Sequence, residues 1–127
     1  MPLRRRVEDE IQRAVVQHLW ARGAYGIVFW HHPAGGYRRP VEAAILKGLG
    51  ARSGFPDLFI LYRARLFGLE LKSGKGRLSP AQAATHVELT NAGAIVGVAY
   101  GLDEALAWLE AHELLRGTAQ WPLKTKS

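Results

Sequence analysis

The chain has 127 residues, enough for one domain with a single hydrophobic core and too few for two. Lys and Arg number 17 against 11 for Asp and Glu, and the resulting net charge of +6 favours a polyanionic partner such as nucleic acid. With no cysteine, disulfides, thiol catalysis and cysteine-bound zinc are excluded. The apolar stretches are shorter than the roughly 20 residues of a membrane span, and an acidic segment follows the basic N-terminus. We therefore expect a cytoplasmic protein without a signal peptide or membrane contact.

The predicted elements alternate between helix and strand. In chain order we expect a helix from Val7 to about Arg22, a strand from Tyr25 to His31, a helix from Val41 to about Leu49, strands from Asp57 to about Leu61 and from Leu66 to Lys72, a helix from Pro80 to about Asn91, a strand from Ile95 to Tyr100 and a helix from Asp103 to about Leu115. This order predicts an α/β fold with a mixed central sheet flanked by helices. The last strand is apolar nearly throughout, which is typical of a strand buried on both faces. We expect residues 1–116 to form this domain and 117–127 a peripheral tail.

The most informative residues are Asp57, Glu70 and Lys72. Asp57 ends the segment GFPD, and Glu70 follows Asp57 by thirteen residues. Side chains alternate along a strand, so Glu70 and Lys72 share one face. If the two strands form a hairpin with a loop of about four residues, Asp57 lies opposite Glu70, with Cβ atoms about 5 Å apart. Two carboxylates that close repel unless a cation lies between them or one is protonated. Such oxygen ligands suit Mg²⁺, and a neighbouring lysine fits a phosphodiester site because it can orient the attacking water and offset transition-state charge.

Each of these signals also has an ordinary structural explanation. Alternating charges are common on exposed strands, and Gly-x-Pro-Asp is most often a turn. A salt bridge between Glu70 and Lys72 is the structural alternative to a catalytic role. The context favours function, because the rest of the strand is apolar and a charge buried there is unfavourable without a partner or a function.

A helical projection of the first helix separates its acidic residues. Glu8 falls on the apolar stripe together with Gln12, whereas Glu10 points nearly opposite. A carboxylate on that stripe is explained if this end of the helix overlooks the site, but acids in a first turn also favour the helix dipole. Gln82 has two interpretations as well. It forms a capping-box pattern with Ser79, and it opens the helix that directly follows the Glu70 strand, within reach of the site.

These segments resemble the virus-type replication-repair nuclease (VRR-NUC) domain, a branch of the PD-(D/E)xK nuclease superfamily, in its small stand-alone phage and bacterial members. The most specific likeness is GLELKSGKGRLSPAQ, from Gly68 to Gln82, and the segments EDEIQ, HPAGG and LKGLG precede it in the expected order. The resemblance extends from about Glu8 to Leu115. Ala34 departs from the pattern, since relatives often carry asparagine before the paired glycines.

The resemblance implies a restriction-endonuclease-like core and hydrolysis of DNA in the cytoplasm of a bacterium or a phage-infected cell. It implies that Lys72 is catalytic, that Gln82 supports the site, and that Mg²⁺ or Mn²⁺ is bound by Glu8, Asp57, Glu70 and the backbone carbonyl of Leu71. It also implies a homodimer that acts on branched DNA such as four-way junctions.

Basic residues around these motifs are the expected contacts to DNA phosphates, which position the backbone without reading its sequence. They are Arg38, Arg39, Lys47, Arg52, Lys75 and Arg77, together with Arg4 to Arg6. For any one of them, a solvated surface charge is the alternative. Two other functions compete with a nuclease: a non-catalytic DNA-binding module or nuclease-fold subunit of a larger DNA-processing assembly, and a metal-free RNA-binding protein. The complete set of Asp57, Glu70 and Lys72 favours the enzyme.

Overall fold

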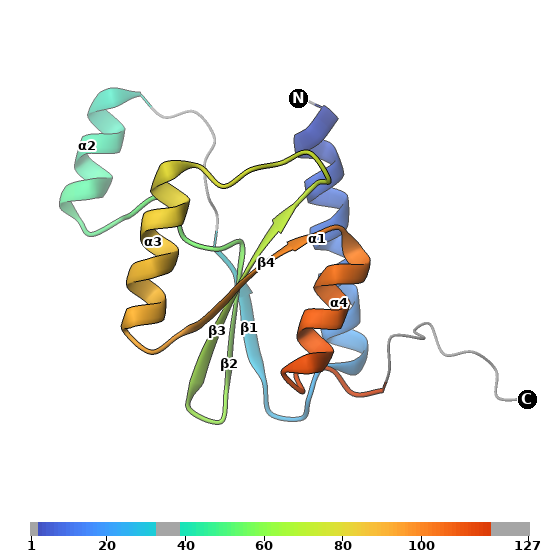
Figure 1. Ribbon diagram of the computed structural model, residues 1–127. Helices are drawn as coiled ribbons and strands as arrows, with labels where there is room; N and C mark the ends of the chain where they lie inside the picture. Colours follow the sequence, from blue (N-terminus) through green and yellow to red (C-terminus); the bar gives the residue numbers. More distant parts are fainter. Residues whose placement is uncertain (1–2, 33–38, 118–127) are drawn as a thin grey trace, which may run out of the picture.

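A computed structural model describes residues 3–32 and 39–117 of the chain (Figure 1). Within these residues, four strands form a single sheet in the order β1 (Val28–His31), β2 (Leu58–Tyr62), β3 (Arg65–Lys72) and β4 (Ile95–Tyr100). Strands β1, β2 and β3 are antiparallel to one another in turn, whereas β4 runs parallel to β3. The sheet is therefore mixed, because β3 and β4 are joined by a helical crossover while β2 and β3 are joined by a tight turn.

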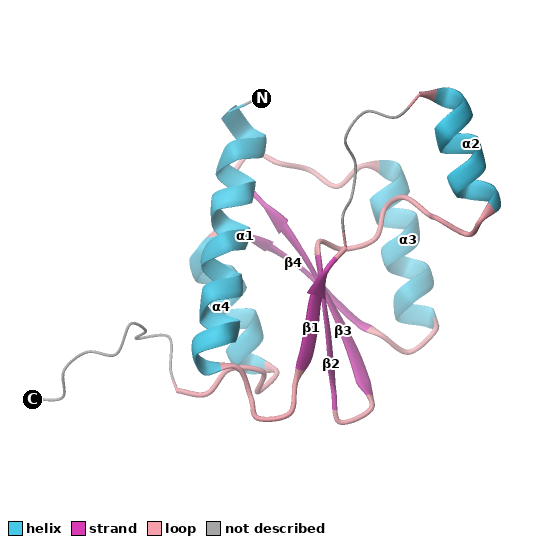
Figure 2. Cartoon of the chain, turned by 180° about the vertical axis from the view of Figure 1, so that it is seen from behind, coloured by secondary structure: helices cyan, strands magenta, loops and turns pink. Residues whose placement is uncertain are grey.

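Helices cover both faces of the sheet (Figure 2). On one face, α1 (Leu3–Arg22) packs against β3 and against α4 (Leu102–Ala111), which itself packs against β4. On the other face, α3 (Pro80–Asn91) packs against β4. The short helix α2 (Pro40–Gly48) lies beyond α3, away from the sheet, and buries none of its residues. A mixed sheet flanked by helices confirms the predicted α/β architecture.

The hydrophobic core lies between the sheet and the layer formed by α1 and α4. Leu69 and Leu71 of β3 are buried in it, and so are apolar residues of the neighbouring elements, namely Val15, Leu19, Leu58, Ile60, Leu106 and Leu109. Because successive side chains of a strand alternate, Glu70 and Lys72 point to the opposite face, toward α3. The apolar half of β3 therefore decides which face its two charged residues occupy.

Three element boundaries differ by three residues or more from those predicted. The first helix begins at Leu3 rather than Val7, because the arginines that precede Val7 are good helix formers. Strand β1 begins at Val28 rather than Tyr25, since Gly26 has a φ of +92° and turns the chain before the strand. Helix α4 ends at Ala111 rather than Leu115, because Glu113 has a φ of +61° that no α-helix accommodates.

Helices cover both faces of the strand Ile95–Tyr100, as its apolar sequence predicted, since α4 packs on one face of β4 and α3 on the other. The burial is less complete than predicted, because β4 is an edge strand of the sheet and of its six residues only Ala99 is buried.

The β2–β3 hairpin is tighter than the predicted loop of about four residues. Tyr62 pairs with Arg65, so only Arg63 and Ala64 form the turn. Their φ angles are +52° and +65°, as in the two-residue type I′ turn that suits the twist of a hairpin. Neither residue is a glycine, although this turn favours glycine or asparagine.

Several sequence predictions lie outside the described residues. These are the loop residues 33–38, which include Ala34 and Arg38, and the tail residues 118–127. The boundary between a domain and a tail at residue 117 therefore stays a prediction. Among the helices that the structure describes, none is both long and apolar enough to cross a bilayer.

The turn leads to a stability prediction. Ala64→Gly should raise the free energy of unfolding by about 1 kcal/mol, because a Cβ is disfavoured in the left-handed region and glycine enters it freely. The same change at Ala84, an exposed position inside α3, should instead lower it by about 1 kcal/mol. Urea denaturation of the two variants measures both effects, and a loss of stability in Ala64→Gly would contradict the turn geometry.

Candidate active site

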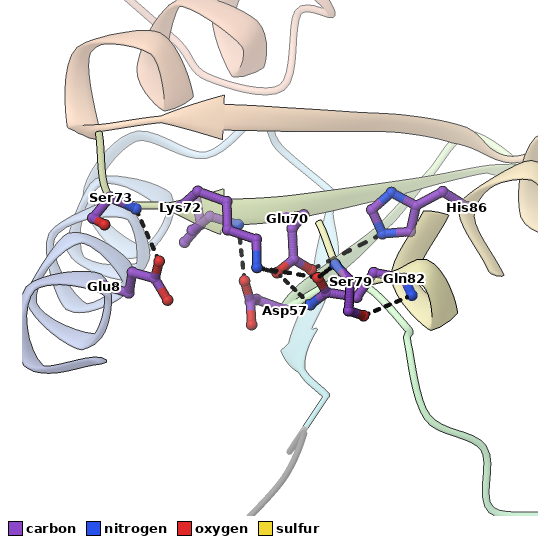
Figure 3. A network of polar contacts seen from close by, with 9 residues as sticks. Glu8, Asp57, Glu70, Lys72, Ser73, Ser79, Gln82 and His86 are labelled. Atoms are coloured by element: carbon purple, nitrogen blue, oxygen red, sulfur yellow. Dashed lines mark hydrogen bonds and ion pairs between the residues drawn. The ribbon is translucent and has the colours of Figure 1, made fainter. Parts of the chain in front are cut away.

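The β2–β3 hairpin places Asp57 beside Glu70. Leu58 pairs with Leu69, so Asp57, one residue before β2, lies opposite Glu70. Oδ2 of Asp57 accepts a 2.8 Å hydrogen bond from the backbone N–H of Leu71, which fixes the carboxylate across the end of the hairpin (Figure 3). The juxtaposition predicted from the spacing is therefore present, with a shorter loop than predicted.

The segment before Asp57 is held against α3. Gly54 has a φ of +87°, and a Cβ at this position would lie only 2.6 Å from the carbonyl oxygen of Ala81 in the first turn of α3. Only glycine permits this close approach. The hydroxyl of Thr85 also donates a 3.2 Å hydrogen bond to the carbonyl of Ser53. The GFPD segment is thus more than a turn, because it fastens the approach to Asp57 onto the helix that carries the remaining groups of the site.

Lys72, Glu70 and Gln82 form a closed set of polar contacts. Lys72 Nζ lies 3.5 Å from Glu70 Oε2 and donates a 3.1 Å hydrogen bond to Gln82 Oε1. Gln82 Nε2 in turn donates a 3.0 Å hydrogen bond to Glu70 Oε2. The salt bridge that competed with a catalytic interpretation therefore exists. It is not an ordinary surface pair, since Glu70 is only 3% exposed and Lys72 8%.

Both interpretations of Gln82 hold at once. Ser79 is the N-cap of α3, and its hydroxyl accepts a 3.0 Å hydrogen bond from the backbone N–H of Gln82. The side-chain Oε1 of Gln82 accepts from the backbone N–H of Ser79 at 2.9 Å, which completes the capping box. The same oxygen accepts from Lys72, so the start of α3 and the candidate site share one atom.

Glu8 lies at the edge of this set (Figure 3). The side chain is half-buried on α1, and Oε2 accepts a 3.0 Å hydrogen bond from the backbone N–H of Ser73, the residue after β3. A Cβ at Gly76 would lie 3.0 Å from Glu8 Oε2 and 3.1 Å from Cδ of Lys72, so the loop after β3 closes tightly over both side chains. Glu10, which the helical projection separated from Glu8, is exposed.

Two histidines lie beside the site, and the sequence analysis did not predict His86 among them. His86 of α3 is buried, and its Nε2 lies 4.0 Å from Glu70 Oε1. It follows Gln82 by four residues, and this helical spacing was the signal that could have revealed it. On the other side, Nδ1 of His31 lies 3.1 Å from the carbonyl oxygen of Asp57 and 2.8 Å from Nε2 of Gln12.

The electrostatics of the site are dominated by burial. The pKa of Glu70 is raised to about 8, mainly by burial and also by the charge of Asp57, while Lys72 opposes the rise. Burial also raises the pKa of Asp57, while the N–H of Leu71, the hydrogen bond with Glu70 and the charge of Lys72 lower it. At neutral pH the carboxyl pair therefore retains a proton. Burial and the charge of Lys72 lower the pKa of His86, which favours its neutral form.

The donor set suits a divalent cation. Two carboxyl groups that retain a proton between them can exchange it for a cation, and carboxylate oxygens are ligands that Mg²⁺ prefers. Among the described residues, no three side chains of His, Asp or Glu gather closely enough to surround an ion. Asp57 and Glu70 could therefore supply two ligands, and backbone, water or substrate oxygens would have to supply the others, as is usual for Mg²⁺.

Two of the predicted phosphate contacts lie beside the site. Lys75 and Arg77 are exposed in the loop that joins β3 to α3, directly after Lys72. Their position at the open end of the sheet fits the prediction that they meet a polyanion near the carboxyl pair.

Three further predicted phosphate contacts are grouped around α2, whereas Arg4 to Arg6 are exposed on α1. Arg39 is the N-cap residue of α2, Lys47 lies in its last turn, and Arg52 follows it in the loop toward Asp57. Arg52 is engaged in an ion pair of 2.9 Å with Glu88 of α3. Because α2 stands away from the sheet, Arg39 and Lys47 are not gathered with the carboxyl pair.

No family model and no curated protein matches the sequence. Two solved structures are similar in fold. One is described as a VRR_NUC domain protein and is 28% identical, with a TM-score of 0.67 over 82% of this chain and 85% of the other. A second, described as a VRR_NUC domain, is 22% identical, with a TM-score of 0.57 over 83% of this chain and 95% of the other, and it supports the fold alone. The shared fold and the 28% identity to the first structure support the resemblance to the VRR-NUC domain that the sequence motifs predict.

Proposed function

We propose that this domain is a metal-dependent deoxyribonuclease that hydrolyses phosphodiester bonds at Asp57, Glu70 and Lys72. The observation that carries the proposal is the buried carboxyl pair with a lysine beside it. Burying charged groups is unfavourable for folding even when they are paired. Here the pair also retains a proton at neutral pH, since the pKa of Glu70 is about 8. A buried carboxyl pair that opposes folding and attracts cations is better explained by a catalytic role than by a contribution to the stability of the fold.

Asp57 and Glu70 would hold Mg²⁺ or Mn²⁺, together with the backbone carbonyl of Leu71. The side chain of Leu71 is buried in the core, so only its backbone is available for this role. Glu8 is the further carboxylate at the site and would add an oxygen ligand or bind a water of the ion's hydration shell. A divalent cation supplies Lewis-acid stabilisation of the charge that builds up on the phosphate oxygens.

Lys72 is the group that this chain itself contributes to the reaction. Its Nζ is held by Gln82 Oε1 and lies beside Glu70 Oε2, so the ammonium group is fixed before substrate arrives. A fixed positive charge next to the scissile phosphate orients the attacking water and stabilises negative charge in the transition state. Gln82 contributes by keeping Lys72 and Glu70 in place.

DNA would approach the site along the basic loop after β3. Lys75 and Arg77 are exposed there and would bind backbone phosphates on either side of the scissile bond without reading sequence. Arg52, Arg39 and Lys47 would extend the contact toward α2, and Arg38 belongs to the same proposal. The net charge of +6 supports a polyanionic substrate.

We extend the proposal to branched DNA, such as four-way junctions, and to a homodimer. Cutting two strands of a junction in a coordinated way needs two active sites. Support for pairing comes from α2, which exposes Val41, Ile45 and Leu49 at spacings of four residues, on one side of a helix that buries nothing. An apolar stripe of this kind is typical of a surface that contacts another protein.

A non-catalytic DNA-binding module or a subunit of a larger assembly is the competing function. It would need neither the proton-sharing pair nor the lysine held beside it. Binding of DNA without cleavage by the wild type, in Mg²⁺ and in Mn²⁺, would favour this second function. An activity on RNA that EDTA leaves unchanged would favour a metal-free RNA-binding protein.

Removing the proposed catalytic groups should separate cleavage from binding. Asp57→Ala, Glu70→Ala and Lys72→Ala should each lower the cleavage rate by roughly 100-fold or more, while DNA affinity changes little. Glu10→Ala, which removes an exposed acid from the same domain, is the control and should cut at the wild-type rate. A cleavage assay on linear, flapped and four-way DNA in Mg²⁺ also measures branch preference. Site variants that cut as well as the control would refute the assignment.

The shared proton predicts how the metal-free protein responds to pH. Because the pKa of Glu70 rises from 4.5 to about 8 on folding, folding takes up a proton between these values. The stabilising effect of that proton is complete below pH 4.5 and is lost as the pH rises through about 8. In EDTA, the unfolding free energy of the wild type should therefore fall with pH relative to that of Glu70→Gln. Denaturant titrations at several pH values measure this difference. Adding Mg²⁺ at pH 8 should raise the unfolding free energy of the wild type but not that of Glu70→Gln. Parallel pH curves for the two proteins would contradict the assignment.

The proposed dimer can be tested at α2. Ile45→Asp, in the middle of the apolar stripe, should convert a dimer into a monomer because a charge would be buried at the contact. Ala43→Asp adds the same charge at an exposed position two residues away, on the other side of the helix, and should leave the dimer intact. Light scattering after size exclusion gives the mass of each protein. A monomeric wild type at working concentration would count against a paired active site.

A further inference from the structure

Two buried polar atoms face each other between β3 and α3. They are Oε1 of Glu70 and Nε2 of His86, 4.0 Å apart (Figure 3). Neither atom has a hydrogen-bond partner among the described residues. Roughly 90% or more of buried polar groups in folded proteins are hydrogen-bonded, so two complementary groups left facing each other are unusual. A donor on Nε2 and an acceptor on Oε1 would satisfy each other.

The second oxygen of Glu70 is already satisfied from the same helix. Oε2 accepts the hydrogen bond from Gln82 Nε2 and lies 3.5 Å from Lys72 Nζ. Gln82 and His86 are four residues apart on α3 and therefore share one face. One helix face thus places a nitrogen opposite each of the two oxygens of a single carboxylate. Each oxygen has two lone pairs, so both remain able to contact a further group.

We propose that His86 is a positioning residue for Glu70, an inference that rests on the proposed metal-dependent function. Its Nε2–H holds Oε1 while Gln82 holds Oε2, so that the plane of the carboxylate is fixed before a cation binds. Closing the gap to a hydrogen bond requires a movement of about 1 Å, or one bridging water. Carboxylates that bind metal ions are commonly hydrogen-bonded in this way by groups that do not touch the ion.

The position of His86 excludes a direct part in the reaction. Glu70 lies between it and Asp57 (Figure 3). A phosphate at the carboxyl pair would meet Lys72 and the loop after β3, not the imidazole. His86 therefore acts through Glu70, and its removal should affect metal binding before it affects DNA binding.

The test is the affinity of the DNA-free protein for Mn²⁺, measured from the electron paramagnetic resonance signal of free Mn²⁺. His86→Leu fills a similar volume with an apolar side chain and removes the Nε2–H donor. It should weaken Mn²⁺ binding by about 10-fold or more. His86→Gln restores an N–H at the same reach and should recover most of the affinity. Val87→Ala, an exposed neighbour on α3, is the matched control.

The outcomes separate this inference from the proposed function. If the wild type binds Mn²⁺ and cuts DNA but His86→Leu matches it, the positioning role is wrong and the nuclease stands. If His86→Gln is as weak as His86→Leu, the shape of the side chain matters and not its donor, and the inference also fails. A wild type that neither binds Mn²⁺ nor cuts DNA overturns both. Should His86→Leu not fold, His86→Met makes the same comparison with a more adaptable apolar side chain.

Discussion

The register of the β2–β3 hairpin is the constraint on which the site depends. Leu58 pairs with Leu69, and this single alignment sets Asp57 opposite Glu70. A slip of one residue would turn every side chain of β3 to the other face, so that the leucines would leave the core and the charged residues would enter it. The burial of Leu69 and Leu71 thus opposes any register that would separate the carboxyl groups. The hydrophobic core and the candidate site are consequently specified by the same alternation.

The helix α3 turns this strand face into an enclosed polar site. It faces the end of β3 with the side chains of Gln82 and His86, and it accepts the close approach of Gly54 at its first turn. Enclosure by the helix excludes water, which raises the pKa of Glu70 and strengthens each remaining electrostatic contact. The helix covers one side only of the carboxyl pair, and Glu8 and the loop after β3 lie on the other side.

The parts of the site that the sequence predicts are those fixed by local periodicity. Alternation along β3 places Glu70 and Lys72 on one face, and the helical period places Glu8 on the inner side of α1, so these positions follow from residue spacing alone. His86 was missed because its spacing from Gln82 indicates a shared helix face but not that this face packs against β3. The edge position of the strand Ile95–Tyr100 was not predicted for a related reason, since its apolar sequence reflects the helices on its faces and not the number of its neighbouring strands. The hairpin loop was predicted too long because Arg63 and Ala64 lack the glycine or asparagine that normally marks a two-residue turn.

The shared atom at Gln82 changes what counts as a conservative substitution. Glutamine and glutamate are interchangeable at the third position of an ordinary capping box, because either can accept the N-cap hydrogen bond. Here Gln82 also donates through Nε2 to Glu70, and glutamate has no donor to offer in its ionised form. It would bring a third carboxyl group against a pair that already retains a proton. The residue that begins this helix is therefore restricted to an amide by the chemistry of the strand beside it, and a glutamate in a related sequence would indicate that the charge balance of the site has been rebuilt.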